Sequence, residues 1–203
     1  MKEEENASNK SDQEKHTLIL QSLNPNITKD ISINSVKLVL DYLSKEDFEN
    51  VDIYVSLLYW FRKSTSLKIS DLTSLIDQLV REKQGFMEII FRFTLVDLNF
   101  ENLHYELSWI FTNLCSLNSA FVIDNVLSPQ FVIYLNQLIE HPKMNIADNA
   151  LHCFANLTGD QSTVEFVLNQ TNLVAYIKKA LESEKIKIKI VRKLSWIIGN
   201  IGI

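Results

Sequence analysis

Glycine and proline are scarce in this chain, whose 203 residues include only 4 of the first and 3 of the second. A β-sandwich or β-barrel depends on many tight turns and normally uses more of both. The sequence also lacks a charge-free run approaching the ~20 residues that cross a bilayer, and its N-terminus has no apolar signal core. These absences favour a soluble helical protein that is not secreted.

Cysteine and positive charge are in short supply as well. The two cysteines, Cys115 and Cys153, lie in apolar helical runs, where a small core residue is favoured over a metal ligand or a redox pair. The formal net charge of −5 argues against nucleic acid as a partner, because nucleic-acid binding needs a basic surface. The same charge is compatible with a basic protein partner.

Residue patterns typical of catalytic or metal sites are missing too. His16, His104 and His141 have no Cys, carboxylate or Ser pattern around them that indicates a metal site or a nucleophile. No glycine-rich loop of the kind that cradles phosphate is present. The sequence therefore predicts a protein that is not an enzyme and that holds no cofactor or metal.

Apolar residues, by contrast, make up 46% of the chain, enough for one good-sized core or for about three to four stacked helical units. Residues 1–15 are the exception. They hold five acidic and three basic side chains and almost nothing apolar, so we expect a disordered acidic arm. N-terminal helices or a partial repeat are expected over residues 16–64, and regular repeats over residues 65–203.

Helical periodicity runs through most of the chain. One helix has clear start signals, with Ser128 as its N-cap and Pro129 in its first turn. Gly159, after the following long helix, predicts a left-handed C-cap. The expected helices cover residues 35–43, 51–62, 70–79, 85–93, 102–117, 120–126, 130–140, 146–158, 162–168, 173–182 and 188–201.

One arrangement recurs in the last three long helices. A ring stands four residues before an asparagine, so that both side chains share one helix face. The pairs are Trp109 with Asn113, His152 with Asn156, and Trp196 with Asn200. The second pair follows the first by 43 residues and the third follows the second by 44. This period is typical of stacked helical repeats of roughly 40–47 residues.

These long helices resemble the third helices of armadillo repeats in importin alpha, the adaptor that carries nuclear-localisation-signal cargo. The resemblance spans about residues 79–201 and implies an all-α fold, a right-handed armadillo-repeat superhelix (α-solenoid) of about three to four repeats. It also implies a protein of the cytoplasm and nucleus. The stretches that carry it are Tyr105-Glu-Leu-Ser-Trp-Ile-Phe-Thr-Asn-Leu, Asp124-Asn-Val-Leu-Ser-Pro-Gln-Phe-Val, Ala150-Leu-His-Cys-Phe-Ala-Asn-Leu-Thr-Gly-Asp and Arg192-Lys-Leu-Ser-Trp-Ile-Ile-Gly-Asn-Ile.

In that family the third helices line a concave groove, and the resemblance implies a role for each matching residue. The residues expected to hydrogen-bond the main chain of an extended cargo peptide are Asn113, Asn156 and Asn200. Trp109 and Trp196 would form slots for the stems of lysine or arginine. His152 would fill the middle slot with a smaller and poorer platform. Asp160 would pair with the key lysine of the signal.

The chemistry of these side chains supports the same roles independently. An amide offers a donor and an acceptor, so one asparagine can satisfy both main-chain groups of a peptide residue. Indole is the best cation–π platform, worth ~0.5–2 kcal/mol per contact. Packed helices lie ~8–10 Å apart and an extended peptide rises ~3.3 Å per residue, so successive asparagines would meet positions about two to three residues apart.

Plainer interpretations of the same residues stay open. Trp109 and Trp196 are compatible with burial in an ordinary core. The asparagines are compatible with hydrogen bonds to a neighbouring helix end, and Asp160 with the N-cap of the next helix. Arg192 and Lys193 are expected on a solvated face; inside the groove they would oppose a basic ligand.

Two functions follow. The first is a nuclear-import-adaptor-like protein that binds lysine- and arginine-rich localisation signals along a Trp/Asn groove. The second is an armadillo scaffold that joins proteins without reading import signals. The N-terminal arm lacks the dense basic cluster with which relatives engage importin beta, which leaves that partner open. Relatives continue for several more repeats, so a fragment, a divergent short paralogue and a self-associating chain are also open.

Overall fold

The structure is a computed structural model that describes residues 33–44, 51–66, 85–117, 119–184 and 186–202, with the single residues 74, 78 and 79. Every regular element in these ranges is helical, and none is long and apolar enough to span a membrane. The elements are α2 (Ile33–Leu43), α3 (Val51–Thr65), α5 (Phe86–Arg92), η1 (Phe93–Leu95), α6 (Glu101–Leu114), α7 (Ser119–Phe121), η2 (Val122–Val126), α8 (Pro129–Ile139), α9 (Met144–Thr158), α10 (Gln161–Gln170), α11 (Leu173–Leu181) and α12 (Ile188–Ile201). The acidic arm expected over 1–15, the segment 16–32 and most of the helix expected over 70–79 lie outside the described residues.

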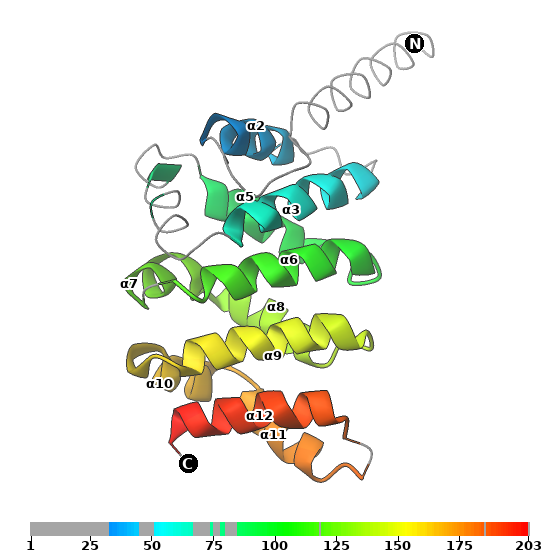
Figure 1. Ribbon diagram of the computed structural model, residues 1–203, viewed down its shortest axis with the longest axis vertical. Helices are drawn as coiled ribbons and strands as arrows, with labels where there is room; N and C mark the ends of the chain where they lie inside the picture. The colour runs from blue at the N-terminus through cyan, green and yellow to red at the C-terminus, as the bar shows by residue number, and fades with distance from the viewer. Residues whose placement is uncertain are drawn as a thin grey trace.

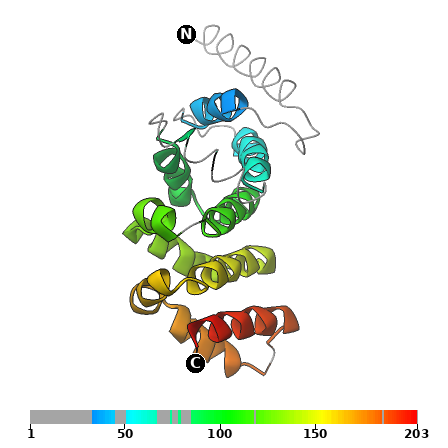
Figure 2. The ribbon, with the colours of Figure 1, turned by 60° about the vertical axis from the view of Figure 1, so that its left-hand side comes forward.

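Four long helices, α3, α6, α9 and α12, stack in chain order along the length of the molecule (Figure 1). Each packs against the next. Most of the shorter helices lie to one side of the stack, and α2 lies across its α3 end, as the turned view shows (Figure 2). The shorter helices pack on the stack and on each other, since α8 and α10 both contact α9 and α10 also contacts α11. The structure is therefore the all-α solenoid that the sequence predicts.

The start of α8 follows the predicted capping. Ser128 precedes the helix in an extended conformation, and its hydroxyl accepts a hydrogen bond of 3.2 Å from the backbone N–H of Phe131. Pro129 occupies the first turn, where its missing N–H removes no helical hydrogen bond. Both start signals are confirmed.

The predicted left-handed cap at Gly159 is wrong. The residue ends α9 with a φ of −73°, in the right-handed region. Its missing side chain matters for space instead, because a Cβ there would lie 3.3 Å from the main-chain oxygen of Asn156 and 3.7 Å from Nδ2 of Asn200. The tight contact is the one with the last turn of α9 itself, so glycine relieves crowding against the carbonyl of Asn156, while the distance to Asn200 is an ordinary van der Waals contact.

The short helix expected over residues 120–126 is divided. The α-helix α7 ends at Phe121, and η2 continues as a π-helical turn. The backbone N–H of Leu127 donates to the carbonyl of Val122 at 3.0 Å, the i+5 spacing of a π-helix. This wider turn keeps both Val122 and Val126 buried.

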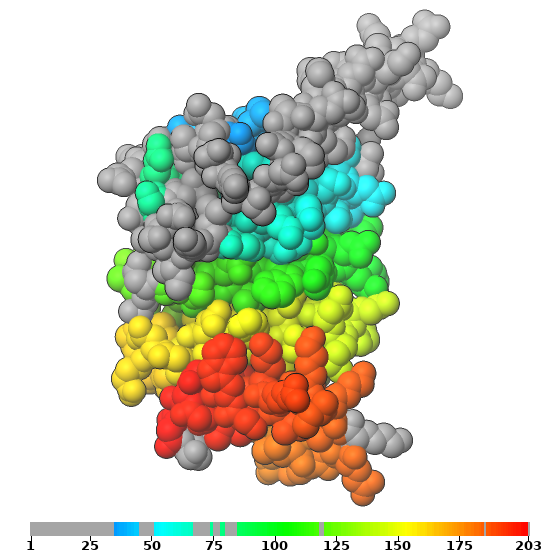
Figure 3. All heavy atoms as spheres, in the orientation of Figure 1, coloured from blue at the N-terminus to red at the C-terminus, as the bar shows by residue number. Residues whose placement is uncertain are grey.

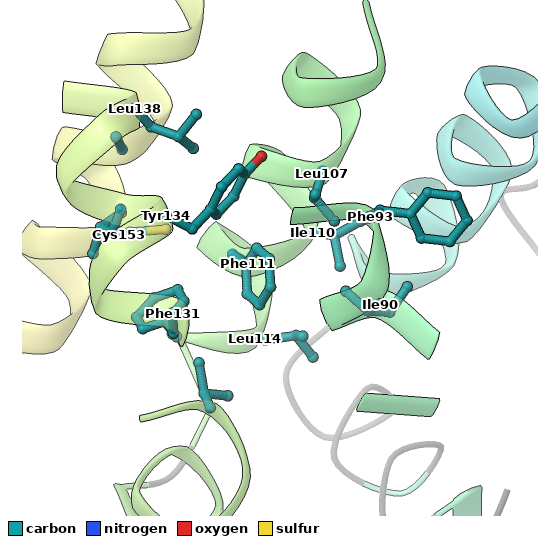
Figure 4. Packing of buried hydrophobic residues seen from close by; sticks show 14 of the residues in the cluster. Ile90, Phe93, Leu107, Ile110, Phe111, Leu114, Phe131, Tyr134, Leu138 and Cys153 are labelled. Carbon is teal, nitrogen blue, oxygen red and sulfur yellow. The ribbon is translucent and has the colours of Figure 1, made fainter. Parts of the chain in front are cut away.

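Aromatic rings join the helices behind the long-helix stack. Phe111 of α6 is 1% exposed and meets three other rings, with centroid distances of 5.5 Å to Phe91, 5.1 Å to Phe131 and 5.8 Å to Tyr134. These partners belong to α5 and α8, so one side chain connects three helices. Figure 4 shows the rings of Phe111, Phe131 and Tyr134 together. Both cysteines are buried free thiols, as expected for core residues.

His104 of α6 is fully buried and makes two hydrogen bonds. Its Nε2 lies 3.1 Å from the main-chain oxygen of Asp97, and its Nδ1 lies 3.0 Å from the hydroxyl of Tyr134. Because a carbonyl oxygen only accepts, Nε2 carries the proton and Nδ1 accepts from the Tyr134 hydroxyl. Burial lowers the pKa of His104, and the backbone bond to Asp97 opposes this shift, so the ring is neutral at pH 7.

Stability is expected to fall as the pH drops below 6.5, the ordinary pKa of histidine. The unfolded chain then binds a proton that folded His104 takes up only at lower pH, so the free energy of unfolding decreases by up to about 1.4 kcal/mol per pH unit for this group. Denaturant unfolding of the wild type and of His104→Gln from about pH 5 to 8 measures the effect. The variant should show a shallower slope, and equal slopes would contradict the assignment.

Candidate functional site

The exposed sides of α3, α6, α9 and α12 form one surface, which we call the long-helix face. These helices form successive bands on one side of the molecule in the space-filling view (Figure 3). Trp109, His152 and Trp196, the aromatic row, lie on this face in consecutive long helices. Trp196 is 44% exposed and the other two rings are partly exposed. The structure thus brings the three predicted ring positions together and leaves each accessible.

Neighbouring rings of the aromatic row touch edge to face. The ring centroids of Trp109 and His152 are 6.2 Å apart, and those of His152 and Trp196 are 5.4 Å apart, with interplanar angles of 65° and 61°. A lysine stem held between two rings needs a contact of ~3.5–4.0 Å on each side, and therefore ring faces ~7–8 Å apart. The row is a continuous ridge in this structure, without open slots between neighbours.

The asparagine row consists of Asn113, Asn156 and Asn200, and each member donates from Nδ2 to the preceding long helix. Asn156 bonds the main-chain oxygen of Thr112 at 2.9 Å, and Asn200 bonds that of Ala155 at 2.9 Å. These oxygens lie in the last turns of α6 and α9, where carbonyls have no backbone N–H donor left in their own helix. The oxygen of Ala155 also accepts from the Thr158 hydroxyl at 3.3 Å. The row therefore caps each long helix from the next one.

Asn113 also bonds the preceding long helix, but through side-chain hydroxyls and not through a main-chain oxygen. Its Nδ2 donates to the hydroxyls of Thr65 at 3.0 Å and Ser66 at 3.2 Å, at the end of α3. The interpretation as helix-end bonds is thus confirmed for the whole row. In the described part of the chain, however, no donor bonds Oδ1 of any of the three, and all three side chains are partly exposed. Each carboxamide joins two helices and keeps an unused acceptor.

Asp160 caps α10. Its carboxylate accepts a bond of 2.9 Å from the backbone N–H of Ser162 and one of 2.5 Å from the Ser162 hydroxyl. The capping interpretation is confirmed. Because Asp160 is also exposed, its pairing with a peptide lysine stays a prediction.

Toward α3 the long-helix face carries an ion pair with little exposure. Arg62 of α3 donates from Nε to a carboxylate oxygen of Glu106 in α6, and the two side chains are 14% and 9% exposed. The Arg62 guanidinium also lies 4.9 Å from the ring centroid of Tyr59. The carboxylate of Glu106 is therefore engaged by a cation of the protein itself.

Toward α12 the face carries lysines of the protein. Lys189 Nζ lies 2.8 Å from Oδ2 of Asp148 in α9, while Oδ1 of Asp148 is buried and bonds no group among the described residues. Lys193 Nζ lies 5.3 Å from the ring centroid of Trp196, a cation–π distance. The position expected for a peptide cation on Trp196 is therefore occupied by Lys193.

Burial and charge together keep His152 neutral. Burial lowers the pKa of His152, the ammonium of Lys193 lowers it further, and Asp148 opposes the shift. Partial burial also lowers the pKa of Lys193, with Asp148 again opposing. At pH 7 the middle ring of the aromatic row is an uncharged imidazole beside an ammonium group.

Comparison with known proteins yields structures and no sequence relative. No protein-family model and no curated protein matches the chain. A computationally designed armadillo repeat protein for modular peptide recognition matches with a TM-score of 0.66 at 11% identity, over 82% of this chain and 64% of its own. A designed armadillo repeat protein in complex with the peptide (KR)4 matches with a TM-score of 0.67 at 14% identity, over 94% and 74%.

The chain has an armadillo-repeat fold. At 11% and 14% identity the likeness shows this fold alone, and the chain spans less than two thirds of the first of the two designed proteins. The narrower resemblance to importin alpha stays a prediction. Within the ranges that the structure describes, no three His, Cys, Asp or Glu side chains gather as metal ligands.

The sequence predicted the rings and amides of the long-helix face, left the position of Lys193 open and did not indicate the ion pair of Glu106. Glu106 and Lys193 each lie three residues before a tryptophan of the aromatic row. The repeat register that aligns Trp109 with Trp196 therefore also aligns these two charges, and it was the signal available in the sequence. Of the two places expected for Lys193, a solvated face or the groove, the structure favours the second, with the partly exposed side chain over the indole of Trp196.

Proposed function

We propose that the protein is an armadillo-repeat scaffold, without enzymatic activity, that binds an extended segment of a partner protein along its long-helix face. The observation that carries the proposal is the alignment of the aromatic row with the asparagine row on three successive helices. Two proteins of the same fold support it, one designed for modular peptide recognition and one in complex with the peptide (KR)4.

The two rows suit an extended chain for physical reasons. The partly exposed rings offer flat apolar surface to side chains of the bound segment. The unused Oδ1 of each asparagine accepts a hydrogen bond from a peptide N–H. Because the helices repeat every ~8–10 Å, these acceptors meet an extended strand about every two to three residues. Such contacts select the extended conformation of the bound segment. Preference for particular residues in that segment then depends mostly on the other side chains of the long-helix face.

A nuclear import adaptor that reads basic localisation signals, in the cytoplasm and nucleus, is the second candidate. The two indoles of the aromatic row favour it, since indole is the best platform for a cation. The edge-to-face contacts within the row and the position of Lys193 over Trp196 favour the scaffold. A peptide lysine would have to displace an ammonium that the protein already holds there.

Trp196→Ala is expected to weaken binding of an extended peptide at least about fivefold, because it removes a large, accessible ring from the row. The probes are three capped, fluorescent peptides of about ten residues, enough to cross three helices. In each, threonine alternates with one other residue, which is glutamate, glutamine or lysine. Fluorescence anisotropy gives the dissociation constant of each probe.

Ile133→Ala is the matched control, because Ile133 is 61% exposed but belongs to α8, outside the long-helix face. It should change each dissociation constant less than about twofold. Failure of all three peptides to bind at about 100 μM would reject the scaffold function. Equal losses in the two alanine variants would reject the long-helix face as the site.

A further inference from the structure

The charges of the long-helix face are unbalanced at its α12 end. Lys189, Arg192, Lys193 and Trp196 follow the spacing i, i+3, i+4, i+7, which places all four on one stripe of the helix. Lys189 and Arg192 are exposed, and Lys193 is partly exposed beside the indole. Asp148 of α9, a carboxylate that raises the pKa of Lys193, already pairs with Lys189 at 2.8 Å.

We propose that the segment bound at this end of the face is acidic, with carboxylate side chains that pair with Lys193 and Arg192 beside Trp196. The inference rests on the proposed function and names the chemical class of its ligand. Neither Lys193 nor Arg192 forms an ion pair with a carboxylate in the described part of the chain. Both cations therefore have their charge available to a partner.

A basic segment would meet the opposite conditions on the same face. Two carboxylates of the face are already engaged from within the protein, Glu106 by Arg62 and Asp148 by Lys189. A peptide lysine would find these counterions taken and would approach Lys193, a like charge. The long-helix face therefore disfavours lysine-rich strands and favours acidic ones.

The geometry of α12 also separates main-chain contacts from side-chain contacts. Lys193 precedes Asn200 by two helical turns, ~10 Å along the axis. A strand whose backbone passes the asparagine row points alternate side chains sideways, toward the aromatic row and its cations. The exposed carboxylate of Asp160 belongs to the cap of α10, just after Gly159, which lies against Asn200. It lies beyond the stripe of cations, at the asparagine end of the face.

The three alternating peptides distinguish failure of this inference from failure of the function. The glutamate peptide is expected to bind about three- to tenfold more tightly than the glutamine peptide, and the lysine peptide most weakly, with the glutamate preference shrinking as salt is raised. Equal or tighter binding of the glutamine or lysine peptide overturns the inference and leaves the scaffold function standing. Binding of none of them rejects both. Stronger competition by single-stranded DNA of about ten nucleotides than by the glutamate peptide also overturns the inference.

Lys193→Gln tests the cation directly. It should weaken the glutamate peptide about three- to tenfold, leave the glutamine peptide within about twofold and tighten the lysine peptide. Lys178→Gln is the matched control, because it removes the same charge from an exposed position on α11, outside the long-helix face. If the two variants weaken the glutamate peptide equally, the preference for glutamate depends only on the net charge of the protein, and the inference is overturned. Their unfolding midpoints show whether both variants remain folded.

Discussion

Replacing Phe111 with alanine is expected to lower the free energy of unfolding by about 3–5 kcal/mol. The side chain is 1% exposed and its ring meets those of Phe91, Phe131 and Tyr134, so its removal opens a cavity where α5, α6 and α8 join. Small domains are stable by only about 5–15 kcal/mol, so this single change removes a large share of the total. Equilibrium unfolding in urea measures it.

Two further variants calibrate that loss. Phe111→Leu keeps most of the apolar volume and should lose about 1–2 kcal/mol. Ile133→Ala truncates a side chain that is 61% exposed and should stay within about 0.5 kcal/mol of the wild type. A loss below about 1 kcal/mol in Phe111→Ala would show that the ring is not packed as described.

Glu106→Ala is expected to lower the free energy of unfolding by about 2–4 kcal/mol. It leaves the guanidinium of Arg62, whose side chain is 14% exposed, without its carboxylate partner between α3 and α6. The larger part of the loss comes from this unpaired charge, since the pair itself gains little over an apolar contact of the same shape. Denaturant unfolding measures the change.

The double variant Arg62→Met with Glu106→Leu separates these two contributions. It removes both charges and fills their volume, so most of the stability lost in Glu106→Ala should return. A double variant as unstable as the single one would mean that the pair itself, and not the stranded charge, holds α3 to α6. A single variant within about 0.5 kcal/mol of the wild type would contradict the low exposure of the pair.

Much of the fold could be predicted from the sequence because its signals are local or periodic. Ser128 and Pro129 mark the start of α8 through their own backbone chemistry. The 43- and 44-residue steps between the ring–asparagine pairs set the repeat without any contact being known. The errors occur where packing around the backbone decides. Gly159 ends α9 in the right-handed region with little room for a Cβ beside the carbonyl of Asn156, and the π-helical turn η2 arises with the burial of Val122 and Val126.

For the candidate site, the sequence predicts which residues share a helix face but not how their side chains contact one another. The i, i+4 spacing puts ring and amide on one face whatever the neighbours are. Whether adjacent rings leave a slot depends on side-chain rotamers and on the packing of successive helices, and the contact of His152 with Trp196 closes it here. Lys193 lies three residues before Trp196 on the same helix, so its place beside the indole could be predicted, and only the side-chain rotamer that puts the ammonium over the ring could not.

The double role of the asparagine row affects how its mutants are interpreted. Asn156 holds the last turn of α6 through the oxygen of Thr112 and also keeps an acceptor unused. Asn156→Ala therefore removes a structural bond together with any ligand bond, and a loss of binding in it would have two causes. Trp196, at 44% exposure, is the cleaner probe of the face.

The most direct test of the proposal that the long-helix face binds a peptide is a titration with the tightest-binding peptide, followed by nuclear magnetic resonance of the tryptophan indole N–H groups and the asparagine side-chain amides. The indole signals of Trp109 and Trp196 and the amide signals of Asn156 and Asn200 should shift along one binding curve. Trp60, only 6% exposed, should not shift and serves as the internal control. A peptide that binds while the signals of Trp196 and Asn200 stay unchanged would contradict the proposed face.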